Sequence, residues 1–168
     1  MKLRTDFSGG GFIEPGDYDF IIENPEYREV EKDFSFYARA TGGDSDGMGL
    51  FDSFLTDYGA NEKVNKKWEI PFGIQKTAAL LASTGLGQSD FKDNDEVKAY
   101  YKSLWERLKN PQSIKALMKK IDGALFHGTV EPRRNDPNKM NIVKYDPVEK
   151  KQAKQPQSGL QSGEEESW

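Results

Sequence analysis

The chain has 168 residues, no cysteine and a formal net charge of −4. A chain of this length builds one domain with one core, and without cysteine it has neither a disulfide framework nor a thiolate metal site. The N-terminus lacks the apolar run of a signal peptide and no stretch approaches the length of a membrane span, so we expect a cytoplasmic protein without membrane association.

Charge is distributed unevenly along the chain. Residues 14–57 carry 12 acidic and 3 basic side chains, whereas residues 58–150 carry 17 basic and 12 acidic ones. A basic segment inside an acidic protein is typical of an anion-binding face that avoids indiscriminate binding to nucleic acid. Ordinary solvated charge is the alternative interpretation.

The first third of the chain alternates apolar and polar residues. This period of two over residues 15–25, 33–41 and 48–58 predicts three strands. The sequence GGDSDG at residues 42–47 is a turn between the second strand and the third. Short connections between consecutive strands indicate an antiparallel meander.

The middle of the chain changes to the period of a helix. Apolar residues recur three or four positions apart over residues 71–87, 93–110 and 111–123, which predicts three helices. The first is expected to end at the glycines of STGLG. The third opens with a proline and stops at a glycine, the usual residues for these two ends.

Two further strands are predicted over residues 124–134 and 139–147, joined by the turn-forming sequence RRNDPN. Three strands, helix, then two strands is the order of the OB-fold, a five-stranded and partly open barrel. We therefore predict a mainly β protein, an OB-fold domain at residues 14–148 with a helical insertion at about residues 71–122. Separate α+β packing is the alternative architecture.

Both ends of the chain are poor in residues that can be buried. Residues 1–13 predict a flexible arm and residues 149–168 a disordered tail. The tail ends in SGEEESW, with the candidate partner-binding residues Glu164, Glu165, Glu166 and Trp168. An acidic strand with an aromatic tip suits capture by another protein, and it also resembles single-stranded DNA enough to compete for a basic groove. A solubilising end with an incidental tryptophan is the alternative.

Few residues offer catalytic or metal chemistry. Asp44, Asp46 and Asp52 resemble the alternating acids of a calcium loop, but the bidentate glutamate is missing, so a structural turn is favoured. His127, the single histidine, lies in a predicted strand without a nucleophile motif, and a surface or core histidine is the favoured interpretation. We therefore expect no catalytic residue, no cofactor and no metal.

Aromatic and basic residues instead recur together. Proteins that bind single-stranded nucleic acid use aromatic rings to stack on bases and basic side chains to contact phosphates. Tyr37 and Arg39 share the outer face of the second strand, and Phe51 lies out of phase with the apolar residues of the third. The candidate contacts for single-stranded DNA are Tyr37, Arg39, Phe51, Lys66, Lys67, Trp68, Arg133, Arg134, Lys139, Lys144 and Tyr145. Tyr37 and Trp68 are equally compatible with a place in the core.

The sequence resembles the single-stranded DNA-binding proteins of tailed bacteriophages. The similarity runs through IEPGDYDFIIENPEY, FSFYARATGG, GLFDSFLTDYG and IQKTAALLASTGLG, then through IDGALFHGTVEPRRNDPNKMNIVKYDP and the tail. It implies an OB-fold that binds single-stranded DNA without sequence specificity in DNA replication, recombination or repair. It further implies a tail that recruits replication and recombination proteins, and it leaves a homodimer open. The competing interpretation is a protein-interaction module that uses the barrel as a scaffold.

Overall fold

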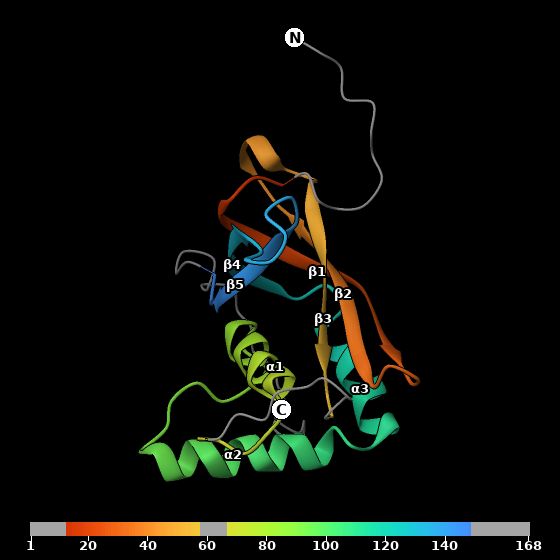
Figure 1. Cartoon of the computed structure of the whole chain (residues 1–168), viewed down its shortest axis with the longest axis vertical. Coiled ribbons are helices and arrows are strands. Elements are labelled where there is room, and N and C mark those ends of the chain that lie inside the picture. The colour runs from red at the N-terminus through yellow and green to blue at the C-terminus, as the bar shows by residue number, and fades with distance from the viewer. Residues whose placement is uncertain (1–12, 58–66, 149–168) are drawn as a thin grey trace.

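The computed structural model describes residues 13–57 and 67–148, which form a curled half-barrel of five antiparallel strands with three helices (Figure 1). The strands are β1 (Gly16–Arg28), β2 (Asp33–Ala40), β3 (Gly49–Leu55), β4 (Leu125–Pro132) and β5 (Met140–Asp146). The helices are α1 (Phe72–Ser83), α2 (Asn94–Arg107) and α3 (Pro111–Ile121), and a short 3-10 turn η1 (Gly43–Ser45) precedes β3. The mainly β class and the order of elements are therefore confirmed.

Several predicted features lie outside the described residues. They are the N-terminal arm up to residue 12, the C-terminal tail from residue 149, and the candidate residues Lys66, Glu164, Glu165, Glu166 and Trp168.

The strands are ordered β3-β2-β1-β4-β5, and every neighbouring pair is antiparallel. β3 and β5 are the two edges of this sheet, and its curl brings them into contact. For the part of the chain described, backbone pairing ends at these two edges, so the half-barrel has an open seam between β3 and β5. Figure 1 shows α2 along the bottom and α1 between α2 and the strands β4 and β5, while β2 and β3 extend down to the level of α1 and α3.

The prediction that the first strand ends at Pro25 is wrong. β1 continues to Arg28 because its register with β2 shifts between Glu23 and Glu26, which leaves the proline in an irregularity of the ladder. A proline has no backbone N–H to donate, so a bulge is the place where a strand tolerates it. Beyond the bulge, two hydrogen bonds of 2.8 and 2.7 Å from Arg28 to Asp33 close the hairpin.

The core is built mainly from phenylalanines that the strand alternation turns inward. Phe20, Phe34, Phe36, Phe54 and Phe126 are fully buried, and the rings of Phe36 and Phe54 meet edge to face at 5.6 Å. Such pairs add to the stability gained from burial alone. The alternation predicted from the sequence is thus the alternation between core and surface.

The helices cover the lower end of this core. α1 contacts β3 and β5, and α3 contacts β1. The Asp93 side chain accepts a hydrogen bond from the Glu96 N–H at the start of α2, and Asn110 caps α3 in the same way. α1 ends at Ser83 with Thr84 as its cap, and the next residue, Gly85, has a φ of +80°, a conformation that stops a helix, so the predicted glycine stop is confirmed.

We expect Gly128→Ala to destabilise the protein, since a Cβ at this position of β4 would lie 2.9 Å from the Phe20 ring and 3.1 Å from the Phe126 ring. Overpacking a core typically lowers the free energy of unfolding by about 1–3 kcal/mol, which urea denaturation measures. Leu125→Ala on the same strand is the control, because Leu125 is exposed and its loss should change stability by about 0.5 kcal/mol or less. Equal stability of the two variants would contradict this packing.

Candidate functional site

The outer face of β2 and β3 carries two aromatic residues directly opposite each other. Tyr37 pairs with Phe51 in the register of these strands. Phe51 is 52% exposed, while its neighbours Leu50 and Asp52 are buried on the other face, as its phase in the sequence predicted. Tyr37 is half-buried on the same outer face. Together the two rings form an aromatic platform, the name used below for Tyr37 and Phe51.

Arg39 lies at one end of the aromatic platform and is held there by an acidic neighbour. Its guanidinium donates two hydrogen bonds, of 2.8 and 2.7 Å, to the Glu23 carboxylate, and a third to the Gly47 carbonyl oxygen. Its Cζ lies 5.7 Å from the centre of the Tyr37 ring. The hydrogen bonds from Arg39 lower the pKa of Glu23. A phosphate that approaches Arg39 would therefore compete with a bidentate carboxylate.

On the other side of Glu23 the outer surface is acidic. The His127 Nδ1 lies 2.9 Å from an Asp19 oxygen, and the Thr129 hydroxyl donates a 2.6 Å hydrogen bond to Asp17. These residues belong to β1 and β4, where Asp17 and Asp19 face outward. His127 is thus a surface histidine between carboxylates. Two outward carboxylates disfavour phosphates over this part of the sheet.

Most of the predicted basic contacts lie around β5 and the loop before it. Arg133, Arg134 and Lys139 are exposed in the β4–β5 loop, which a 2.8 Å hydrogen bond from the Arg133 N–H to the Lys139 carbonyl oxygen closes. Lys144 of β5 is exposed, and its ammonium lies 3.6 Å from an Asp146 oxygen. This loop and strand form a basic edge of the half-barrel.

Lys67 and Trp68 lie elsewhere, beside the helices. The Trp68 ring meets the Tyr101 ring of α2 edge to face at 5.4 Å, and the Lys67 ammonium lies 4.7 Å from the centre of the Trp68 ring. Trp68 is therefore partly buried against α2 and does not extend the aromatic platform.

Tyr145, predicted as a contact for DNA, points into the half-barrel. Its ring packs at 5.8 Å from Phe54 and 5.5 Å from Phe126. Its hydroxyl donates a 2.6 Å hydrogen bond to Asp52, which bridges the open seam from β5 to β3. The sequence placed Tyr145 among the exposed residues because a bulge breaks the alternation of β5, where Lys144 pairs with Thr129 but Ile142 pairs with Val130.

Asp52 is a buried carboxylate at the centre of the seam. It accepts hydrogen bonds from the Tyr145 hydroxyl and from the Ser53 N–H, and the Lys76 ammonium of α1 lies 3.7 Å away. Burial raises the pKa of Asp52, although Lys76 and the Tyr145 hydrogen bond oppose that effect. Burial and the neighbouring Asp52 charge raise the pKa of Tyr145 well above its usual value, so it remains a donor.

Asp52 does not form a cluster with Asp44 and Asp46. Those two residues are exposed on the η1 turn, whereas Asp52 faces the interior. Within residues 13–57 and 67–148, no three acidic or histidine side chains gather in a way that could hold a metal ion.

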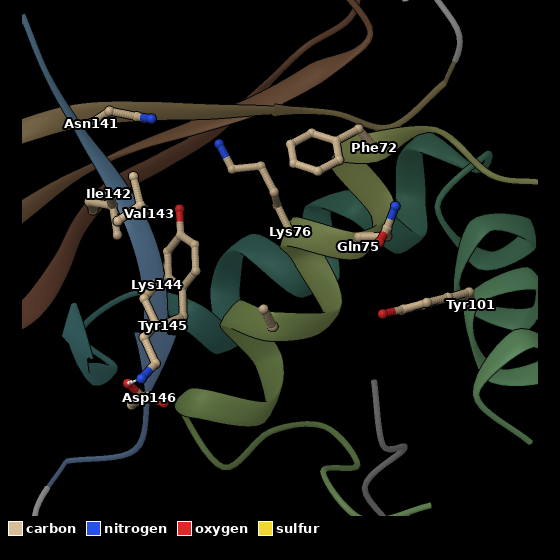
Figure 2. Close-up of a pocket in the computed structure, with 11 residues that line it drawn as sticks. Phe72, Gln75, Lys76, Tyr101, Asn141, Ile142, Val143, Lys144, Tyr145 and Asp146 are labelled. Atoms are coloured by element: carbon tan, nitrogen blue, oxygen red, sulfur yellow. Dashed lines mark ion pairs between the residues drawn. The ribbon is translucent and has the colours of Figure 1, made fainter. Parts of the chain in front are cut away.

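A pocket of about 510 Å³ lies between α1 and β5, next to the seam (Figure 2). Its wall combines aromatic, apolar and amide side chains with two lysines, namely Phe72, Gln75, Lys76, Ala79, Tyr101, Asn141, Ile142, Val143, Lys144, Tyr145 and Asp146. Phe72, Gln75, Lys76 and Tyr101 were not among the site residues predicted from the sequence. The helical period gave no signal for Lys76, because it lies two residues from both Ile74 and Ala78 and therefore off the apolar stripe of α1.

The candidate residues therefore form three separate groups. Tyr37, Phe51 and Arg39 share one face, the basic residues of the β4–β5 loop and β5 share an edge, and Lys67 with Trp68 packs on α2. The pocket connects the last two groups, since both Lys144 and the Trp68 neighbour Tyr101 line it.

Comparison with models of protein families and with curated protein sequences finds no match for this chain. Among the helices described, none is both long and apolar enough to cross a membrane.

We expect Tyr145→Phe to lower the free energy of unfolding by about 1–3 kcal/mol, because it leaves an oxygen of the buried Asp52 without its donor. Tyr18→Phe is the matched control. It removes the same group, but the Tyr18 hydroxyl bonds an exposed carbonyl oxygen of Glu14. Urea denaturation of both variants gives the comparison. Equal losses of unfolding free energy in the two variants would show that the hydrogen bond from Tyr145 to Asp52 stabilises the fold no more than an exposed one.

The raised pKa of Asp52 gives stability a specific dependence on pH. A carboxyl group whose folded-state pKa lies above its unfolded value favours folding at acid pH, and this contribution is lost as pH rises through the folded-state pKa. The pH range over which this stability is lost begins near 3.8, the usual pKa of the group, and extends upward. The stability of the wild type relative to Asp52→Asn should therefore fall as pH rises through that window, measured by urea denaturation in a series of buffers.

Glu23→Gln is the control for this pH series, because hydrogen bonds from Arg39 lower the pKa of Glu23. The stability of the wild type relative to this variant should rise with pH, the opposite direction. If the stability of the wild type relative to Asp52→Asn instead rises with pH, Lys76 and Tyr145 lower the pKa of Asp52 more than burial raises it.

Proposed function

We propose that this protein binds single-stranded DNA without sequence specificity on an OB-fold barrel. The topology supports the fold. A β1-β2-β3 meander pairs through β1 with the β4-β5 hairpin, and the helices lie between β3 and β4. The contact between edges β3 and β5 is where a five-stranded barrel of this type closes in part.

The aromatic platform is the observation that carries the proposal. Tyr37 and Phe51 lie opposite each other on the outer face of two neighbouring strands, with a large part of Phe51 open to solvent. An aromatic pair on the outer face of a sheet lies outside the core, whereas every base has a face that stacks on such a ring. The second and third strands are also the ones that bind oligonucleotides in OB-folds.

The surrounding charges indicate where the phosphates run. Arg39 lies beside the platform, and Arg133, Arg134, Lys139 and Lys144 lie at the basic edge. The acidic outer face of β1 disfavours a path of the phosphates across β1. Contacts to phosphate release counterions, so the affinity should fall steeply with salt.

In this proposal the protein serves phage replication, recombination or repair in the cytoplasm of the host cell. Glu164, Glu165, Glu166 and Trp168 recruit partner proteins and compete with DNA for the basic surface. A homodimer remains compatible with this function. The protein-interaction module is the alternative, in which the platform receives a partner protein.

Fluorescence anisotropy of a labelled poly-dT strand, against a duplex of equal length at two salt concentrations, tests the function. We expect tight, salt-sensitive binding to the single strand alone. Phe51→Ala and Tyr37→Ala should each weaken it by about 1–3 kcal/mol, the usual contribution of one stacked base. Leu125→Ala, which removes an exposed apolar side chain from β4, should bind as the wild type does.

Two results would overturn the proposal. One is equal affinity for single strand and duplex, which would indicate a response to charge alone. The other is no binding to either one, also after removal of residues 159–168. That result would leave the protein-interaction module as the better account.

A further inference from the structure

We propose that the pocket between α1 and β5 binds one unstacked nucleobase of the bound DNA strand. The inference rests on the proposed function and adds a second contact area, which lies across the edge of strand β3 from the aromatic platform. The volume of about 510 Å³ is typical of a small-ligand site, and so is the mixture of apolar walls with a few polar groups.

Three aromatic rings from different elements line this pocket, Tyr145 of β5 and two from the helices. Phe72, the first residue of α1, is 55% exposed, and Tyr101 points toward α1 from α2 (Figure 2). Tyr101 is held in place by the edge-to-face contact with Trp68. A ring fixed before the ligand arrives loses little freedom on binding. This gives Trp68 a role in single-strand binding that is indirect, through the position of Tyr101.

The polar groups of the wall suit a base better than a peptide side chain. The buried Gln75 Nε2 has no hydrogen-bond partner in the described part of the chain, and the Asn141 amide lines the same pocket. Each amide offers a donor and an acceptor, as do the edges of nucleobases. An indole ring offers one donor and a phenyl ring none, so these two amides match the edge of a base better than an aromatic side chain.

The β-bulge of β5 supplies the rim of the pocket. Because Val143 is the extra residue between the pairs of Ile142 and Lys144, both Val143 and Lys144 are exposed on one side of the strand. Bulges re-aim side chains next to binding sites. Val143 offers an apolar contact and Lys144 a cation for the phosphate of the inserted nucleotide, in competition with Asp146.

Strand β3 makes the two contact areas continuous. Phe51 faces outward, while the next residue, Asp52, faces the seam and contacts Lys76 of the pocket wall. A DNA strand that stacks on Phe51 and crosses the edge of β3 therefore reaches the pocket within a short distance along the DNA. The path ends at the basic edge, where Lys139 and Lys144 flank Asn141 and Val143.

Photocrosslinking of the full-length wild-type protein tests this inference. The probes are poly-dT oligonucleotides that each carry one 5-iododeoxyuridine at a different position, with crosslinked peptides identified by mass spectrometry. We expect crosslinks both to peptides with Tyr37 or Phe51 and, from other positions, to peptides with Phe72 or Tyr101. By anisotropy, Phe72→Ala should weaken binding about tenfold, the loss of one stacked base.

Gln75→Leu is a second variant of nearly equal volume, and it should also weaken binding. Leu125→Ala should not. Thermal unfolding of each variant shows whether it folds, and the crosslinking of the wild type does not depend on that result.

The outcomes separate this inference from the proposed function. Single-strand binding that needs Phe51, without crosslinks in the pocket and with wild-type affinity of Phe72→Ala, overturns the base site alone. No binding to any oligonucleotide overturns both. A synthetic peptide of residues 158–168 that binds the wild type but not Phe72→Ala, and that poly-dT does not displace, would assign the pocket to a peptide and overturn the base site as well.

Discussion

The hydrogen bond between Tyr145 and Asp52 connects the two edges of a sheet that backbone pairing leaves open in the part of the chain described. Lys76 adds α1 to the same network. A buried carboxylate is tolerated where donors surround it, and such a network is strong because water does not compete for its members. The network joins β3, β5 and α1 at the seam, and two of its members, Lys76 and Tyr145, form part of the wall of the pocket between α1 and β5.

Charge divides the surface of the half-barrel into two regions. The outer face of β1 presents Asp17, Asp19 and Glu23, whereas the β4–β5 loop and β5 present most of the cations near the sheet. The aromatic platform lies on the acidic side of this division, and its neighbour Arg39 is hydrogen-bonded to Glu23. In the proposed function, a DNA strand on the platform would therefore gain more from stacking than from that single arginine, and the basic edge would attract its phosphates.

Local patterns predicted the elements well, because each depends on near neighbours in the sequence. Alternation located the strands and placed Phe51 on the outer face and Leu50 on the inner one, while the helical period with its terminal proline and glycines located the helices. The errors arose where the period breaks. A bulge let β1 pass Pro25, and a second bulge turned Tyr145 inward. Asp52 was grouped with Asp44 and Asp46 by spacing alone, but the strand buries it while the turn exposes them.

The sequence by itself determined the mainly β class, the order of strands and helices, and the shared outer face of Tyr37, Arg39 and Phe51 on neighbouring strands. Only the tertiary structure decided what meets at the seam. Asp52, Lys76 and Tyr145 are far apart along the chain, and Phe72 and Tyr101 line one pocket from different helices. Periodicity records which face a side chain occupies, but the curl of the sheet and the packing of α1 against it decide which faces meet.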